Sequence, residues 1–500
     1  MDQAVRVSAA IRTDELVAGK PCAEAGPGIG VRRWAALGVL CLGAFLVVLD
    51  TTIVNIAIPN ILSSLRLSLD EVLWTLNAYT LVYAALLITG GRLGDLFGPR
   101  RMLVVGITLF VAASISCSVS QTAAELIGAR VAQAIGGALL TPQTLAMIPM
   151  VFPQQRRGAA IGLWSGAAGL AAAVGPTLGG LLVSTAGWRA IFLFNVPLGV
   201  LAIAGAYSLH PATSPRRSHR IDVGGILLAT AGLFAIVFAM VEGQRYRWST
   251  ISGPLTIPEV AAGGALLLVV FLLWERRQPE PLVPFGLFAD RNFALSTWVI
   301  AVFQVVTLSF IVVFALYFQA GLGMSALEAG IALVPAPLAI MLVSPIAGRL
   351  TDRINPKLIL MVGLTVGAVG LTWVIGIASA VASPQTFVLP LVVVGGGLGC
   401  GFAVVMTLGM RGAPPHLAGA ASGVLNTSRQ VGAAIGGAIA AALLESQLGS
   451  APLSAAAASS ATGAASFSSA VQPTLAVPVV LLVLAGLSCT WIRQQHRVSI

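Results

Sequence analysis

Charged residues are scarce in this sequence. Asp, Glu, Lys and Arg make up 9% of its 500 residues, whereas 57% are hydrophobic, and the mean hydropathy is +0.93. A soluble domain carries about a quarter charged residues, so this composition excludes an ordinary soluble protein. Apolar stretches of roughly 20 residues recur along the chain, each long enough to cross a ~30 Å hydrocarbon layer as a helix. The sequence therefore predicts an all-α membrane protein with many spans.

Cysteine, histidine and lysine are also rare, and their placement excludes several kinds of site. The five cysteines have no paired spacing, which argues against a disulfide framework or a metal centre. The four histidines fall in predicted loops or in the C-terminal tail, and no HExxH motif occurs. Neither Lys20 nor Lys357 stands in a GxxxxGK[ST] phosphate-binding loop. We therefore expect neither an enzyme nor an ATP-driven pump, and no cofactor or metal.

The apolar runs predict fourteen spans. Their approximate ranges are 34–58, 70–90, 102–119, 124–150, 157–183, 188–208, 222–242, 255–275, 292–319, 326–347, 358–380, 385–410, 418–443 and 471–492. With the N-terminus inside, the outer loops hold only Arg66, Arg189, Arg245 and Arg247 of the 28 Lys and Arg residues. Basic residues mark cytoplasmic loops. We therefore expect a multi-pass protein of the cytoplasmic membrane with both termini inside, and we assign the positive charge to topology rather than to nucleic-acid binding.

A repeated loop indicates an internal duplication. "GRLGDLFGPR" at 91–100 and "GRLTDRINPK" at 348–357 share Gly, Arg, Leu, Asp, Pro and a final basic residue in one register. Such parallel repeats predict two bundles that rock about a central cavity. The expected domains are two six-helix bundles with two helices inserted between them and a disordered tail at the start. In order they are the tail 1–33, the bundle 34–208, the insert 209–291, the bundle 292–492 and the tail 493–500.

The loop after the second span is a candidate conformational gate. Glycines permit tight turns and close helix approach, and Asp95 can complement a helix N-terminus or pair with an arginine in one of two conformations. The alternative is simple anchoring of the loop by basic residues. The second copy differs by Asn355 where the first has Gly98. The gating prediction covers Gly91, Arg92, Gly94, Asp95, Gly98, Arg100 and Arg101.

One aspartate interrupts the first apolar run, "FLVVLDTTIVNIAIP" at 45–59. Asp50 lies ~24 Å along its helix from the inner boundary, and Arg130 lies ~9 Å from the outer end of the fourth span, so the two share a similar depth. Intramembrane charges usually find partners or line water. We predict that Asp50 carries a proton under the control of Arg130. The alternatives are that Asp50 bonds locally to Thr51, Thr52 and Asn55, and that Arg130 only binds neighbouring carbonyl groups.

Polar residues deep in other spans predict a substrate cavity. Arg429, in "LNTSRQVGAAIGG", lies near the midplane beside Gln430, and the predicted cavity residues are Asn55, Gln133, Arg429 and Gln430. One acid against two arginines favours neutral or weakly acidic lipophilic aromatic substrates over dicationic ones. The acids Asp222, Glu242, Glu275 and Glu328 fall at predicted span ends, where we expect interface anchors. The uncharged segment 446–473 is expected to be a flexible external loop, with a re-entrant segment as the alternative.

Five motifs in order resemble those of the major facilitator superfamily. "GRLGDLFGPRR" resembles its cytoplasmic loop signature, "GARVAQAIGGALLTP" at 128–142 its fourth-helix signature, and "GAAGLAAAVGPTLGG" at 166–180 its fifth-helix antiporter pattern. "LDTTIVNIAIP" and "GWRAIFLFNVPLG" resemble motifs of the fourteen-helix drug:proton antiporter branch. The resemblance implies the major facilitator fold and export of drug-like compounds driven by inward proton flow.

The fifth-helix pattern carries the antiporter expectation. Its residues are Gly166, Gly175, Pro176, Gly179 and Gly180, which would pack a bent helix tightly against its neighbours and seal the cavity against protons. Ordinary small-residue packing is the alternative. The alternative function on the same scaffold is a proton-coupled importer of a small nutrient, although this pattern and the two extra helices speak against it. We expect the protein to work as a monomer.

Overall fold

The structure is a computed structural model that describes residues 27–207, 222–243, 245–378, 383–448 and 461–493. Among these residues, thirteen helices are long and apolar enough to cross a membrane. They coincide with thirteen of the fourteen predicted spans, and the remaining prediction, 418–443, falls within the 31-residue helix α18. The prediction of a polytopic all-α membrane protein is confirmed.

The N-terminal half of the described chain is helical throughout. Its helices are α2 (Pro27–Leu65), α3 (Leu69–Phe97), α4 (Pro99–Val119), α5 (Ala123–Ala146), α6 (Ile148–Val151), α7 (Arg157–Ala186), α8 (Arg189–Leu193) and α9 (Asn195–Tyr207), with the short 3₁₀ helix η1 (Gln154–Arg156). The inserted segment then forms α10 (Val223–Glu242), a small antiparallel hairpin of β1 (Thr250–Ser252) and β2 (Leu255–Thr256), and α11 (Ile257–Glu275).

The C-terminal half repeats the helical pattern. Its helices are α12 (Gly286–Ala289), α13 (Arg291–Leu316), α14 (Ala326–Leu333), α15 (Pro335–Thr351), α16 (Pro356–Ile377), α17 (Val388–Arg411), α18 (Ala418–Leu448) and α20 (Ala461–Ser488). Short segments join them: η2, a π-helical turn (Tyr317–Gly321), and the 3₁₀ helices η3 (Pro384–Phe387), η4 (Pro415–Leu417) and η5 (Cys489–Trp491).

Local sequence explains where several helices begin. Ser68, Thr256 and Ser325 each cap the helix that follows, and the glutamate three residues later closes a capping box in every case. Between α3 and α4 the chain turns at Gly98, whose φ of 95° is favourable for glycine, and Pro99 starts the next helix. These signals stop and restart the helices where the long apolar runs change direction.

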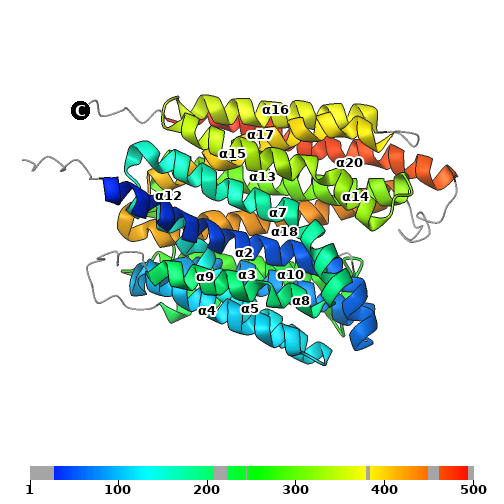
Figure 1. Ribbon diagram of the computed structural model, residues 1–500, viewed down its shortest axis with the longest axis horizontal. Coiled ribbons are helices and arrows are strands. Elements are labelled where there is room, and N and C mark those ends of the chain that lie inside the picture. Colours follow the sequence, from blue (N-terminus) through cyan, green and yellow to red (C-terminus); the bar gives the residue numbers. More distant parts are fainter. Residues whose placement is uncertain (1–26, 208–221, 244, 379–382, 449–460, 494–500) are drawn as a thin grey trace, which may run out of the picture.

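The helices form two layers that meet along their length. In Figure 1, α2 to α5, α8 and α9 lie in the lower part, α13 to α17 and α20 lie in the upper part, and α7 and α18 run between them. The strongest contacts between the halves join α7 to α15 and α3 to α18. The inserted helices α10 and α11 pack against each other, and α10 also contacts α3 and α18.

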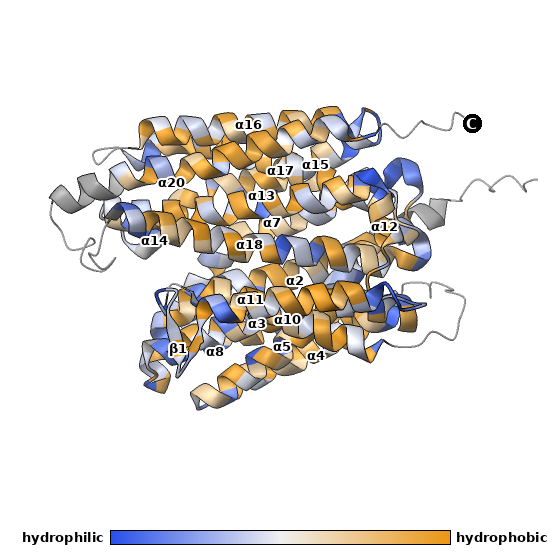
Figure 2. Cartoon of the chain, turned by 180° about the vertical axis from the view of Figure 1, so that it is seen from behind, coloured by the Kyte–Doolittle hydropathy of each residue, from blue (hydrophilic) through white to orange (hydrophobic). Residues whose placement is uncertain are grey.

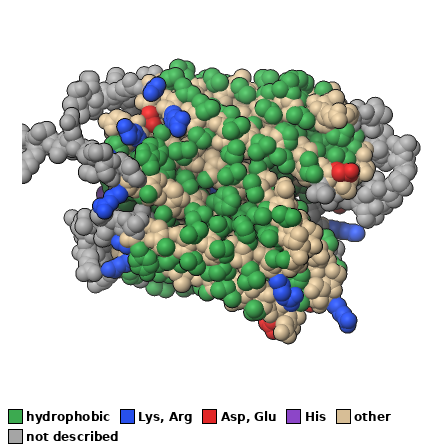
Figure 3. Space-filling view, in the orientation of Figure 1, with side chains coloured by type: hydrophobic (Ala, Val, Ile, Leu, Met, Phe, Trp, Pro, Cys, Tyr) green, Lys and Arg blue, Asp and Glu red, His purple; other side chains and the backbone are tan. Residues whose placement is uncertain are grey.

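Polarity is segregated along the long axis. Figure 2 shows hydrophobic residues along the middle of the helices and hydrophilic residues toward their two ends. On the face drawn in Figure 3, the Lys and Arg side chains lie toward the ends, and hydrophobic side chains cover the broad middle. Many large apolar side chains of the long helices are exposed, such as Leu266, Leu342 and Val362. This is the surface expected of a protein whose middle faces lipid.

Several boundaries differ from the predictions. Helix α2 begins at Pro27, inside the predicted tail 1–33, whose first 26 residues lie outside the described part of the chain. The predicted span 326–347 is divided between α14 and α15, which starts with Pro335. The prediction of a loop over 446–473 is wrong in part, because residues from Ala461 onward belong to α20. Residues 449–460 of that loop, the linker 208–221 and the tail residues 494–500 lie outside the description.

Two predicted interface anchors are buried instead. Glu242 and Glu275 are each 1% exposed. Glu242 accepts a hydrogen bond of 2.6 Å from Asn77 of α3 and pairs with Arg245, and Glu275 accepts one from the backbone N–H of Val283. The packing of the inserted helices covers both acids. The partners of Glu242 compensate its burial, whereas Glu275 Oε1 has no hydrogen-bond partner among the described residues.

Candidate functional site

The centre of the N-terminal half contains a buried ion pair between two helices. Asp50 of α2 is 0% exposed and Arg130 of α5 is 1% exposed. Arg130 Nη1 lies 2.5 Å from Asp50 Oδ2. The shared depth predicted from the two apolar runs thus corresponds to a direct contact. Removing two charges from water is costly unless each finds good partners, so the surroundings of this pair determine its behaviour.

Two amides and a hydroxyl complete the polar shell of the carboxylate, and we call these five side chains the charge cluster: Asp50, Ser114, Arg130, Gln133 and Asn195. Gln133 Nε2 donates to Asp50 Oδ1 (2.8 Å) and to Ser114 Oγ (2.7 Å). Asn195 Nδ2 donates to Asp50 Oδ1 (3.0 Å) and to Ser114 Oγ (3.3 Å). Gln133 Oε1 in turn accepts 2.6 Å from Arg130 Nη1. Helices α2, α4, α5 and α9 are joined here by charge-assisted hydrogen bonds.

Aromatic rings and one carbonyl group enclose the arginine. The Arg130 guanidinium carbon lies 4.2 Å from the centre of the Tyr79 ring and 5.9 Å from that of Phe192. Arg130 Nε also donates to the Thr75 carbonyl oxygen at 3.3 Å. The arginine therefore binds the acid and also a backbone carbonyl group, so the two roles weighed for it coexist. Cation–π contacts in such a desolvated place add to the stability of the charged arginine.

The local alternative for Asp50 is wrong. Thr51 and Thr52 bond to backbone carbonyl groups of Val48 and Leu49 in their own helix. Asn55 donates to the Thr51 carbonyl group. None of these three side chains contacts Asp50 through a hydrogen bond among the described residues. The partners of the aspartate all come from other helices.

A kink places Asn195 beside the acid. The predicted span 188–208 is broken at Phe194 into α8 and α9. Pro197 lacks the N–H that would bond to the carbonyl group four residues earlier, so the helix cannot continue unbroken there. Asn195 opens α9 and is 0% exposed. Asn195 stands in "GWRAIFLFNVPLG" but is not among the predicted site residues, although an asparagine two residues before a proline in an apolar run was an available signal.

The first repeated loop binds the opposite half. Asp95 Oδ1 accepts 2.8 Å from the backbone N–H of Gly419, and Oδ2 accepts 2.7 Å from that of Ala420. Both N–H groups belong to the first turn of α18, where they have no partner within the helix. The carboxylate thus caps a helix of the C-terminal half and complements its positive end.

The second repeated loop makes the matching contact in the other direction. Asp352 Oδ1 and Oδ2 accept 2.9 Å each from the backbone N–H groups of Gly158 and Ala159, in the first turn of α7. Arg411 lies 3.4 Å from the same carboxylate. Burial raises the pKa of Asp352 above its usual value, although the two backbone N–H groups and Arg411 act to lower it. Asn355, which stands where the first copy has Gly98, caps α16 and leaves the contact intact.

Glycines let these helices approach closely. A Cβ atom on Gly91 would collide with the Gly419 carbonyl oxygen, and a Cβ atom on Gly348 would collide with that of Gly158. The two crossings, α3 with α18 and α7 with α15, therefore have no room for a side chain. They stand at corresponding positions of the two repeats, and together they hold the halves together at the end of the bundle that carries the loops.

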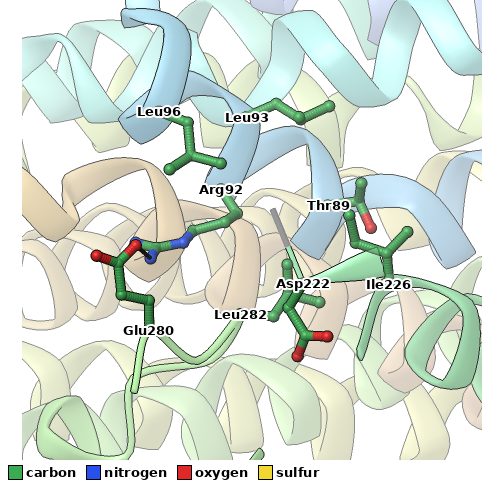
Figure 4. A pocket seen from close by; sticks show the side chains of 8 residues that line it. All are labelled: Thr89, Arg92, Leu93, Leu96, Asp222, Ile226, Glu280 and Leu282. Atoms are coloured by element: carbon green, nitrogen blue, oxygen red, sulfur yellow. Dashed lines mark ion pairs between the residues drawn. The ribbon is translucent and has the colours of Figure 1, made fainter. Parts of the chain in front are cut away.

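The remaining residues of the first loop have separate contacts. Arg92 is 8% exposed, and its Nη2 lies 4.0 Å from Glu280 Oε2. Figure 4 shows this pair facing a recess lined by Thr89, Arg92, Leu93, Leu96, Asp222, Ile226, Glu280 and Leu282. Gly94 packs against the Gln143 amide. Arg100 Nε and Nη2 donate to the carbonyl groups of Ala206 (2.9 Å) and Tyr207 (2.8 Å), whereas Arg101 is exposed.

The glycine pattern of α7 packs on two sides. A Cβ atom on Gly166 would lie 3.1 Å from the Met341 carbonyl oxygen of α15, in the other half. Gly175 and Gly179 face Thr52 and Ile53 of α2, next to Asp50. The predicted close packing is wrong for Gly180, because a Cβ atom there would meet nothing within 4 Å. Pro176 lies inside the helix between these contacts.

The predicted cavity residues do not form one group in this conformation. Gln133 is 0% exposed and belongs to the charge cluster. Asn55 is exposed on α2, and Arg429 and Gln430 are half-buried on α18. The Arg429 Nε is buried without a hydrogen-bond partner among the described residues. Arg429 therefore keeps an unused donor inside the C-terminal half.

Comparison with known proteins agrees with this architecture. The Major Facilitator Superfamily model matches residues 40–437. An uncharacterized MFS-type transporter of Mycobacterium tuberculosis is 38% identical over 83% of this chain and 71% of its own length. The Tetracenomycin C resistance and export protein of Streptomyces glaucescens is 34% identical over 84% and 78%.

A solved structure supports the fold alone. That of the proton:xylose symporter XylE has a TM-score of 0.62 with 13% sequence identity, and covers 93% of this chain and 96% of that chain. Together with the family model and the relatives, this confirms the expected fold class, and the family makes the chain a membrane transporter rather than an enzyme. The repeated loops, the helical halves and these matches agree: the chain belongs to the major facilitator superfamily.

Proposed function

We propose that this protein exports drug-like or antibiotic compounds across the cytoplasmic membrane in exchange for protons, and that Asp50 carries the proton. The observation that supports the proposal most directly is the buried pair of Asp50 and Arg130, held between helices with no exposed surface on the acid. Ionisable groups at membrane depth are costly and typically functional. A merely structural pair would be replaceable by well-packed apolar side chains at little cost.

The relatives favour export over import. The Streptomyces glaucescens relative is named for resistance and export of tetracenomycin C, and others at 31–35% identity carry names of antibiotic or multidrug resistance proteins. This is the direction expected of the drug:proton antiporter branch, and it disfavours the nutrient importer. The symporter XylE does not support import, because its 13% identity extends only to the fold.

Coupling follows from the chemistry of the pair. With Arg130 at 2.5 Å and two amide donors on Oδ1, the ionised carboxylate is well solvated by protein groups. A movement that separates Arg130 from Asp50 leaves a buried carboxylate without its counter-charge, and such a group takes up a proton. Substrate that binds one conformation better than the other biases the same movement, which links the two fluxes.

The two repeated loops form the gate of this proposal. Asp95 and Asp352 each cap a helix of the opposite half, so both contacts must break when that end of the bundle opens. The positive-inside rule assigns this end, with both termini, to the cytoplasm. The structure then corresponds to a state closed toward the cytoplasm. Residues 34–208 and 292–492 act as the two rocking bundles, and residues 209–291 supply the inserted helices.

The substrate site belongs between the bundles in this scheme. Arg429, with its unused Nε, and Gln430 project from α18, a helix that contacts α3 and α5 of the other half. Because Asp50 is paired with Arg130, Arg429 is the charged residue left to contact the substrate. A cationic contact favours neutral or weakly acidic lipophilic aromatic compounds. Each group of the proton site comes from one chain, so we propose that a monomer is sufficient.

Inverted membrane vesicles test the function. Vesicles with wild-type protein and a respiration-driven pH gradient should release protons when tetracenomycin C or another compound from a susceptibility panel is added, as measured by dequenching of a pH-sensitive acridine dye. Asp50→Asn should be inserted at wild-type levels and give no dequenching, and the host should become as sensitive as one without the gene. Normal proton-coupled efflux in this variant would exclude Asp50 as the carrier, and proton-linked uptake by whole cells would favour the importer.

A further inference from the structure

Only the NH₂ group of the Asn195 side-chain amide makes hydrogen bonds, and its oxygen makes none with the described residues. Its Nδ2 donates to Asp50 Oδ1 (3.0 Å) and to Ser114 Oγ (3.3 Å). Its Oδ1 is buried and accepts no hydrogen bond from the described residues. Buried polar atoms in proteins nearly always have partners, so an orphan oxygen next to an ionisable group requires an explanation. The oxygen and nitrogen of an amide exchange places by rotation about the last side-chain bond.

The second amide of the charge cluster lacks this freedom. Gln133 Nε2 donates to Asp50 Oδ1 and Ser114 Oγ, but its Oε1 also accepts from Arg130 Nη1 at 2.6 Å. Rotation of Gln133 would place its NH₂ group against the guanidinium, donor against donor. Asn195 has no such constraint. Of the two amides that bind Asp50, only Asn195 can turn without breaking a contact to the arginine.

We propose that Asn195 is a positioning residue that follows the protonation of Asp50 by rotating its amide. The inference deepens the proposed function, because it requires that Asp50 carry the proton. While Asp50 is ionised, Asn195 donates to Oδ1 as observed. When Arg130 and Gln133, which are bonded to each other on α5, have moved away from the carboxylate, a proton from solvent forms an O–H bond on Oδ1, beside Asn195. The rotated amide then offers its oxygen to this O–H group and to the Ser114 hydroxyl group.

Asn195 thus keeps a hydrogen bond to Asp50 in both protonation states, and α9 stays attached to α2 through the cycle. A donor-only or apolar side chain at this place would favour one state. The charged and titratable groups that face Asp50 are Arg130 from α5, Tyr79 from α3 and Cys117 from α4. Arg429 of α18 interacts with Tyr79 at longer range. From α8, the described residue Phe192 faces Arg130 with its uncharged ring.

Infrared difference spectra of the purified full-length protein in detergent, recorded during a pH titration, test the rotation. A carboxylic acid C=O band that Asp50→Asn removes reports Asp50, and an amide C=O band that shifts with ¹³C-labelled asparagine and disappears in Asn195→Leu reports Asn195. Both bands should change with one midpoint. Asn195→Leu loses a bond in both protonation states, but the bond to the ionised acid is charge-assisted and therefore the stronger one, so the Asp50 midpoint should move by up to about one unit toward higher pH. Asn60→Leu, an exposed asparagine of α2, should leave it unchanged.

A near-isosteric variant guards against misfolding. Asn195→Asp keeps the shape and places a second carboxyl group beside Asp50, so the two share one proton and the midpoint should move further upward. If no carboxyl band depends on Asp50, the proton-carrier proposal fails, and the rotation fails with it. If Asp50 titrates but the midpoint and the amide band are the same in Asn195→Leu, Asn195→Asp and Asn60→Leu, the rotation alone is overturned.

Discussion

Asp95 and Asp352 make the same contact in opposite directions. Asp95, in the first repeated loop, accepts hydrogen bonds from two N–H groups at the start of α18, and Asp352, in the second, accepts two from the start of α7. Each acid therefore caps a helix that belongs to the other half of the molecule. The internal duplication has produced a pair of reciprocal locks, and both close the same end of the bundle.

Neutralising either lock should favour the open form of that end. Asp95→Asn or Asp352→Asn removes the charge and one of the two acceptor atoms, a loss of about 1 kcal/mol for a helix cap, which is about a fivefold shift in the closed-to-open ratio. Phe97 and Ile354 are both exposed. Spin labels on cysteines introduced at these positions would report, by pulsed electron paramagnetic resonance, the distance between the two repeated loops. The long-distance population should grow in each variant and more in the double variant.

Asp70→Asn serves as the matched control for this experiment. Asp70 lies at the other end of α3, is 62% exposed at the side chain and pairs with Arg245. Its loss should leave the distance distribution at the loop end as in the wild type. A wild-type distribution in Asp95→Asn and Asp352→Asn would mean that the caps do not hold the halves together.

Two glycines of one motif should respond differently to the same substitution. A Cβ atom on Gly175 would collide with Thr52, two residues from Asp50, whereas one on Gly180 meets open space. We expect Gly175→Ala to lower the free energy of unfolding by about 1–3 kcal/mol and to slow efflux, because α2 must move. Gly180→Ala should stay within about 0.5 kcal/mol. Thermal unfolding in detergent and vesicle transport would measure both, and equal behaviour of the two variants would contradict the assigned packing.

The ion pair could be predicted from the sequence because charges are rare in it. Asp50 and Arg130 each interrupt a long apolar run, and the rise of a helix places both at one depth. The duplication was equally visible, since the two loops share their register. The partner of each loop was not, because the first turns of α7 and α18 are 194 and 324 residues away from Asp352 and Asp95, and nothing local marks a backbone N–H as a ligand.

Neutral polar residues were the part that sequence reasoning missed. Ser114, Tyr79 and Asn195 resemble many other residues in apolar runs, and their position depends on how four helices pack and on the break before Pro197. The same limit explains Glu242, which was expected at an interface but is covered by the packing of α10 on α3. Burial of a residue at a helix end depends on which helices pack beside it. The sequence indicates the two bundles but not which helices are neighbours in space.

The balance of the buried pair gives a last prediction. Arg130→Ala leaves Asp50 buried without its counter-charge, and breaking a buried pair on one side costs about 3–5 kcal/mol. Thermal unfolding of the purified protein should therefore show a large loss of stability. Asp50→Asn combined with Arg130→Gln removes both charges and keeps the polar contacts, so we expect this double variant to recover much of the stability but no proton-coupled efflux. Full stability in Arg130→Ala would show that the arginine does not compensate the charge of Asp50. It would therefore contradict the coupling scheme, which requires Arg130 as the counter-charge.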